Sequence, residues 1–206
     1  MNLKCFILSL LSLLFFVNVQ AQYQEPSGYN VKYYYVDLGL PSGVKWATHN
    51  IGATNVQDGG RYIAWGENAL NKDTTPKNSK TFKKNMTDIS GNPSYDIASL
   101  DWCGKWRIPT KYEMEELINL CKWEWTEYSG RKGYKVTGPN GNAIFLPAGG
   151  SNSSFFPYGK YGCYWTSTPY QDGNNTQAYY LNFDSSSHKL QQQMRHVGYS
   201  IRPVLK

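Results

Sequence analysis

The clearest constraint on the fold is a helix start signal in WRIPTKYEMEEL, residues 106–117. Thr110, followed three residues later by Glu113, forms a capping box, in which each side chain bonds the backbone N–H of the other residue. Pro109 keeps the residue before it extended, so the helix cannot begin earlier. The apolar stripe at helical spacing consists of Met114, Leu117, Ile118 and Cys121. The sequence therefore predicts a helix over residues 111–122.

Elsewhere the apolar residues come in short runs between turn residues, a pattern typical of strands. Tyrosine and tryptophan, with 17 and 7 copies, carry much of the apolar content. Extended segments are predicted at residues 33–40, 44–53, 59–67, 133–150 (a hairpin around Asn140-Gly141), 161–168, 178–183, 188–194 and 199–204. Residues 68–94 are polar and aperiodic, and we expect a long surface excursion there. Strands and helices do not alternate, so we predict an α+β fold: antiparallel sheets of short strands, one or two helices and long loops.

The N-terminal stretch has the features of a secretory signal peptide. A positive residue, Lys4, precedes an apolar run at residues 5–17 that is short for a membrane span, and small residues follow. We predict a signal peptide over residues 1–21, with an uncleaved signal anchor as the alternative. The next residue is Gln22 and not cysteine, so we expect no lipoprotein.

The mature chain is long enough for one domain with its own core. We assign residues 22–32 to a polar leader and residues 33–206 to the domain. No later stretch is apolar enough to span a bilayer, so we expect no transmembrane segment after cleavage. The expected location is outside the cell or at the cell surface, and the periplasm is the alternative.

Six motifs in order resemble the Fibrobacter succinogenes major paralogous domain family, which comprises secreted or surface proteins of the Bacteroidota. They are YVDLGLPSGVKWATHNIGA, YIAWGE, WCGKWRIPTKYEMEEL, GYKVTGPNGNAIFLPAGG, YWTST and YSIRPV, and they span Tyr33 to Val204. The resemblance implies a C-type-lectin-like fold, with YYYVDL paired beside YSIRPV and ligands held by a loop-rich half. The Glu-Pro-Asn, Gln-Pro-Asp and Trp-Asn-Asp motifs of calcium-dependent lectins are missing from the domain. The resemblance therefore does not imply calcium-dependent sugar binding.

The same resemblance gives WRIPT a role as the turn that leads the chain into its helix. We expect the guanidinium of Arg107 to bond backbone carbonyls or to stack on an indole. Residues expected to be structural are Trp106, Arg107, Thr110, Glu113, Trp165 and Arg202.

Three cysteines remain after signal cleavage, namely Cys103, Cys121 and Cys163. In an oxidising compartment an odd number allows at most one disulfide in a monomer. Our working hypothesis pairs Cys121, on the helix, with Cys163, on a core strand.

The sequence lacks the motifs of catalytic and metal sites. Its histidines, His49, His188 and His196, have neither HxH nor HExxH spacing, and no GxSxG elbow, phosphate loop or dinucleotide fingerprint occurs. We therefore expect no enzyme, no metal and no cofactor. An enzyme of the formylglycine-generating type is the weakest alternative, because its paired cysteines have no counterpart near the last strand. The net charge of +6 is not accompanied by a nucleic-acid motif, so we expect no nucleic-acid partner.

The late loops have the composition of adaptable binding surfaces, with Tyr, Asn, Ser, Gly, Gln and Arg intermixed. We therefore predict a monomeric module that binds a glycan or a protein. The alternative is a structural subunit or adhesin tip of a surface assembly. In the strand at residues 188–194, Leu190 and Met194 would face the core and the residues between and after them would face outward. The predicted ligand-binding residues are Tyr158, Tyr161, Tyr170, Asp172, Asn174, Gln191, Gln193, Arg195 and His196.

Overall fold

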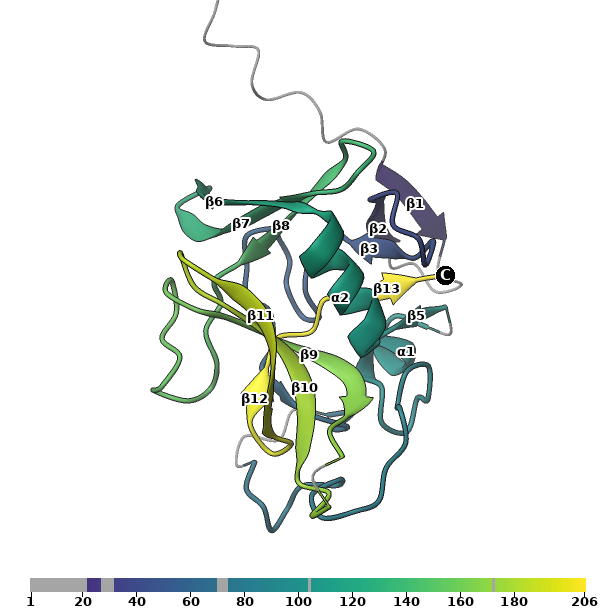
Figure 1. The fold of residues 1–206 in the computed structure, drawn as a ribbon. Helices are drawn as coiled ribbons and strands as arrows, with labels where there is room; N and C mark the ends of the chain where they lie inside the picture. Colours follow the sequence, from purple (N-terminus) through teal and green to yellow (C-terminus); the bar gives the residue numbers. More distant parts are fainter. Residues whose placement is uncertain (1–21, 27–31, 70–73, 104, 172) are drawn as a thin grey trace, which may run out of the picture.

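The computed structural model describes residues 22–26, 32–69, 74–103, 105–171 and 173–206 (Figure 1). The predicted signal peptide lies outside these residues, and the first five residues of the predicted leader form a strand. The helices are α1 (Ile97–Asp101) and α2 (Lys111–Leu120). The strands are β1 (Gln22–Pro26), β2 (Lys32–Asp37), β3 (Lys45–Ala47), β4 (Ile63–Ala64), β5 (Trp106–Arg107), β6 (Lys122–Tyr128), β7 (Arg131–Thr137), β8 (Ala143–Pro147), β9 (Gly162–Pro169), β10 (Gln177–Phe183), β11 (His188–Met194), β12 (Gly198–Tyr199) and β13 (Val204–Leu205).

The predicted fold class, α+β and C-type-lectin-like, is wrong, because the described chain is mostly β. Its helices are only five and ten residues long. The strands form four small sheets, with orders β1-β2-β3-β13-β5, β11-β10-β9, β12-β4 and β6-β7-β8. Strand β3 lies between β2 and β13, so the early and late strands that the resemblance placed side by side are not neighbours. The apolar runs of the sequence are short and are interrupted by turn residues, so they form several small sheets. Few residues remain for helices.

Helix α2 begins as predicted, and its capping box is confirmed. Thr110 Oγ1 accepts from the Glu113 N–H at 3.3 Å, and Glu113 Oε2 accepts from the Thr110 N–H at 2.8 Å. The same carboxylate accepts from Arg107 Nη1 at 2.8 Å and from Arg107 Nη2. Burial raises the pKa of the Glu113 carboxyl, but the bonds from Arg107 and Thr110 outweigh it and hold the pKa below its usual value. The side chain of Glu113 therefore takes part both in the cap of α2 and in an ion pair with Arg107.

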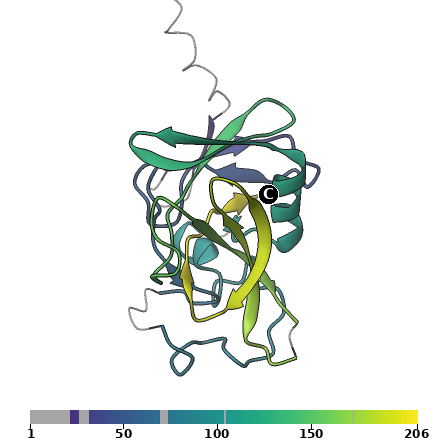
Figure 2. The same ribbon diagram turned by 60° about the vertical axis from the view of Figure 1, so that its left-hand side comes forward.

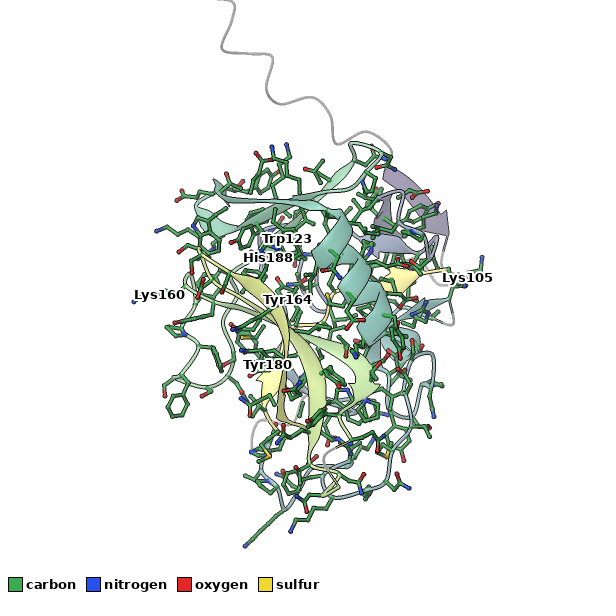
Figure 3. All side chains as sticks on the ribbon, in the orientation of Figure 1. Lys105, Trp123, Lys160, Tyr164, Tyr180 and His188 are labelled. Carbon is green, nitrogen blue, oxygen red and sulfur yellow. The ribbon has the colours of Figure 1, made fainter. Side chains whose placement is uncertain are left out.

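The helix ends at Leu120, earlier than predicted, because the chain turns directly into β6. The periodicity of the sequence gave no sign of this strand. Strand β6 pairs antiparallel with β7 along its whole length through the turn at Ser129-Gly130. His188, at the start of β11, stacks on Trp123 of β6 with ring centroids 4.4 Å apart (Figure 3). The predicted hairpin that follows is confirmed as β7 and β8.

Sheet β9–β11 is packed on both faces. Tyr164 of β9 belongs to the apolar cluster that contains Leu117 of α2, and its neighbour Trp165 belongs to a second cluster on the other side. Helix α2 contacts all three strands and lies alongside them in Figures 1 and 2. The second cluster is rich in aromatic rings, with Trp65, Trp102, Trp106, Trp165, Tyr180 and Tyr199 all buried.

Arg202 has the structural role that we expected. Its guanidinium is fully buried and donates to the carbonyl oxygens of Ala47, Thr48 and Phe145 and to Asn50 Oδ1, at 2.8–3.1 Å. Burial lowers the pKa of Arg202 to about 10, so the group stays charged at neutral pH. This one side chain joins the chain after β3 to β8.

The excursion before α1 has no helix or strand in its described residues 68–69 and 74–94, but it is attached to the domain. Thr81 is buried and donates from Oγ1 to the carbonyl of Trp65 at 2.8 Å. Ile89 is also buried, and its N–H bonds the carbonyl of Ser167 at 3.1 Å. The excursion therefore contributes to the core and is not a purely superficial loop.

The predicted disulfide between Cys121 and Cys163 is wrong, and all three described cysteines are free thiols. Cys163 lies in the aromatic cluster on one side of sheet β9–β11, whereas Cys121 packs against the cluster on the other side. The sheet therefore separates the two sulfur atoms. Burial raises the pKa of Cys121 to about 11 and that of Cys163 to about 12, while Cys103 is exposed.

We predict that the folded protein reacts with a thiol-alkylating reagent at Cys103 first and at Cys163 only after unfolding. The thiolate is the reactive species, and burial disfavours it at Cys163. Mass spectrometry of the alkylated protein should count three modified cysteines in denaturant. A count of one in denaturant without reductant would show that a disulfide forms after all.

We predict that Glu113→Ala destabilises the fold by about 3 kcal/mol, since it removes half of the cap and leaves the partly buried Arg107 without its carboxylate. Urea unfolding gives this value. Because the pKa of Glu113 is depressed in the folded state, the stabilisation is present above the unfolded pKa and is lost as pH falls through the folded pKa.

The matched control for this variant is Glu115→Ala, which removes an exposed carboxylate from the same helix. Its ion pair with Lys111 at i,i+4 should contribute only about 0.3–0.5 kcal/mol. Equal losses in the two variants would contradict the structural role of Glu113.

Candidate functional site

The loop between β8 and β9 is fixed by its own backbone. The N–H of Gly150 bonds the carbonyl of Tyr161 at 2.7 Å, and the N–H of Gly159 bonds the carbonyl of Ala148 at 2.7 Å. Gly150 has φ +69°, and a Cβ atom there would lie 2.6 Å from the carbonyl oxygen of Phe156. Only glycine fits such a position. The loop therefore holds its shape before any ligand arrives.

Two aromatic side chains of this loop are displayed on the surface. Phe155 is 85% exposed, and Tyr158 is 45% exposed with the guanidinium of Arg131 over its ring at 5.0 Å. Phe156 and Tyr161 turn inward and meet edge to face, with ring centroids 5.5 Å apart. The loop thus presents one phenylalanine and one tyrosine on a base made of two packed rings.

Strand β11 lies on the same side of the molecule as this loop (Figure 1). The ring of Phe156 contacts that of Tyr199, with centroids 6.1 Å apart. Tyr199 in turn contacts Tyr180, with centroids 4.6 Å apart. The hydroxyl of Tyr180 donates to Gln191 Oε1 at 3.1 Å. Gln193, two residues further along the same face of β11, is also half-buried.

We call the combined region the loop–strand surface. A second link joins its two parts, because the N–H of Gly198, just after β11, donates to Asn152 Oδ1 at 2.9 Å. The surface brings together five residues, of which all but the first were predicted from the sequence: Phe155, Tyr158, Tyr161, Gln191 and Gln193.

Other predicted residues lie apart from this surface. Tyr170 and Asn174 belong to the β9–β10 loop at the lower end of the sheet in Figure 1. Tyr170 packs edge to face on Tyr179 at 5.3 Å. Asp172 falls outside the described residues. His196 is half-buried against the ring of Phe82 at 5.4 Å. The predicted ligand-binding residues of the late loops therefore do not lie together on one surface.

The predicted ligand role of Arg195 conflicts with the structure, because its side chain is fully buried. The guanidinium lies over the ring of Trp65 at 4.7 Å. Its Nη1 donates to the carbonyls of Thr81 and Lys84, at 3.1 and 2.9 Å, and its Nε donates to that of Gln177 at 2.9 Å. Met194, which we expected in the core, is 37% exposed, whereas Arg195 is buried beneath the excursion. Arg195 holds the excursion onto the sheet.

Of the residues that we expected to be structural, Trp106, Glu113, Trp165 and Arg202 are buried, and Arg107 and Thr110 are partly buried. Trp106 is 2% exposed and meets Trp102 edge to face at 5.2 Å. Trp165 is fully buried, and its Nε1 donates to the carbonyl of Ile63 at 2.9 Å. Arg107 bonds a carboxylate as well as a backbone carbonyl, which the sequence did not indicate.

A pocket of about 530 Å³ lies elsewhere, between β2, the loops that follow β3, and the end of α1. Its lining includes Tyr33, Tyr34, His49, Arg61, Asp101 and Trp102. Sequence analysis missed it because these residues come from four separate segments and share no motif. No group of three or more His, Cys, Asp or Glu side chains suited to a metal ion occurs in the part of the chain that the structure describes. Within the same part, no helix combines the length and apolar character that crossing a membrane requires.

Comparison with known proteins gives one family. The model of the Lcl C-terminal domain matches residues 54–205, about three quarters of the chain. This match supports the resemblance to the Fibrobacter paralogous domain that the motifs indicated, but it does not confirm a C-type-lectin-like fold. No curated protein and no solved structure matches the chain.

We predict that Arg195→Ala destabilises the fold by about 2–4 kcal/mol, because it leaves several buried carbonyls without a donor. Thermal and urea unfolding measure the loss. Arg131→Ala is the matched control, since that arginine also lies over an aromatic ring but is exposed, and its loss should stay near 0.5 kcal/mol. A fully stable Arg195→Ala protein would contradict the structural role of this arginine.

Proposed function

Since the chain belongs to the Lcl C-terminal domain family, we propose that it is a secreted or cell-surface module that binds a glycan or protein ligand without catalysis. The family suggests a surface-associated, non-catalytic module and names no ligand. The observation that carries the proposal is Phe155, an 85% exposed aromatic side chain on a loop that the backbone holds in place. The ligand contacts the loop–strand surface.

An exposed ring on a fixed loop is typical of a binding anchor, because its burial by a ligand stabilises the complex with little loss of conformational freedom. Tyr158 adds a second ring, which the guanidinium of Arg131 orients. Gln191 and Gln193 supply amide groups from the β11 part of the surface. Such a surface suits sugars, whose C–H faces stack on aromatic rings and whose hydroxyls bond amides, and it equally suits a protein loop.

The module is proposed to act as a monomer and without cofactor or nucleic acid. Cys163 does not favour nucleophilic catalysis, because burial raises its pKa to about 12 and a buried thiol of this kind is inert. Export of the protein rests on the signal peptide predicted at residues 1–21.

We predict that Phe155→Ala and Tyr158→Ala each weaken binding to the hits of a glycan and host-protein array at least tenfold. Removing a central aromatic anchor typically costs about 2 kcal/mol or more of binding free energy. Both variants should keep the melting temperature of the wild type, because neither ring is buried. Surface plasmon resonance on the array hits gives the affinities.

The matched control is Tyr112→Ala, on α2, which removes a ring that is 72% exposed but lies outside the loop–strand surface. It should bind like the wild type. Equal binding by all three variants would overturn the assignment of the surface. Self-assembly in gel filtration, together with no array hit, would favour the structural-subunit alternative.

A further inference from the structure

The pocket between β2, the loops after β3 and the end of α1 has an aromatic wall and, beside it, a pair of oppositely charged side chains. Tyr33 stacks on Trp102 with ring centroids 3.8 Å apart and an interplanar angle of 11°. His49 meets the same indole at 5.1 Å, and Tyr34 is 40% exposed. These rings come from β2, the segment after β3 and the end of α1, and contacts among them fix their positions.

The polar part consists of Arg61 and Asp101. Arg61 Nη1 lies 3.7 Å from Asp101 Oδ2, too far for a direct hydrogen bond. The two side chains are 46% and 39% exposed. A guanidinium has five donors and a carboxylate several acceptor sites. An adjacent pair of hydroxyl groups could therefore bond both groups at once.

We propose that this pocket is a second binding site, for one neutral sugar residue that bonds Arg61 and Asp101 through neighbouring hydroxyls. The pocket volume of about 530 Å³ falls within the range of small-molecule sites and can hold a monosaccharide. The site goes beyond the loop–strand surface, with which it shares no lining residue.

Charge favours a neutral ligand over an ionic one. Arg61 and Asp101 neutralise each other, so their combined field selects neither anions nor cations. Desolvation by burial lowers the pKa of His49 to about 4, with Arg202 contributing, so its ring is uncharged at neutral pH. The rest of the lining adds hydroxyl groups from Thr54 and Tyr33. A neutral polyhydroxylated ring loses less hydration energy on entering such a pocket than an ion does.

Saturation-transfer NMR with a panel of neutral monosaccharides tests the proposal on the mature protein. At least one sugar should bind, with a Kd in the millimolar range, and should quench tryptophan fluorescence through Trp102. Arg61→Met and Asp101→Ala should each weaken that binding at least fivefold. Both residues are exposed, so the variants should fold, and circular dichroism checks this.

Tyr112→Ala serves as the control and should bind the sugar like the wild type, because Tyr112, an exposed residue of α2, lies outside both the pocket and the loop–strand surface. Absence of binding by every neutral sugar would overturn the proposal, as would full binding in both pocket variants. Binding of free amino acids but not of sugars would also overturn it, since the ion pair would then recognise a zwitterion. Array hits that depend on Phe155 and not on Arg61 would leave the loop–strand function intact whatever the pocket binds.

Discussion

The arrangement of this protein depends on a three-stranded sheet in which β9 and β10 are largely buried, with apolar clusters on both sides. Successive residues of β9, Tyr164 and Trp165, point into different aromatic clusters, and each cluster is closed by a different part of the chain. Helix α2 packs on one side, and the second cluster lies on the other. Because β9 and β10 are covered on both sides, the candidate binding regions lie at the edge strand β11 and in the loops.

Short strands leave many carbonyl groups without a partner in a neighbouring strand, and buried arginines satisfy several of them. Arg202 bonds three carbonyls near β3 and β8, and Arg195 bonds three more around the excursion. A guanidinium suits this task because it has five donors in a fixed plane. The two arginines therefore join segments that have no sheet in common. Arginines used in this way add to the positive net charge of the chain without placing a positive side chain on its surface.

The two candidate binding regions differ in how they are built. The loop–strand surface presents exposed rings from one loop that its own backbone bonds hold, so it can contact a large partner. The pocket is assembled from segments far apart in the sequence and encloses a small volume, so it suits a single ring. Both use aromatic side chains, in which the chain is rich, as apolar surface with a polar end. A protein short of aliphatic residues thus uses the same residue types for its core and for recognition.

Local patterns determined the features that depend on neighbouring residues. The capping box at Thr110 and Glu113, the β7–β8 hairpin and the displayed Tyr158 were predicted because each rests on contacts within a few residues. The orientation of Arg195, the separation of Cys121 from Cys163, the order of strands around β3 and the pocket at Arg61 and Asp101 were not. These depend on which segments meet across the core, and periodicity carries no information on that. The sequence by itself determined where α2 begins, where the β7–β8 hairpin turns and which rings are available, whereas only tertiary packing decided which of those side chains face solvent.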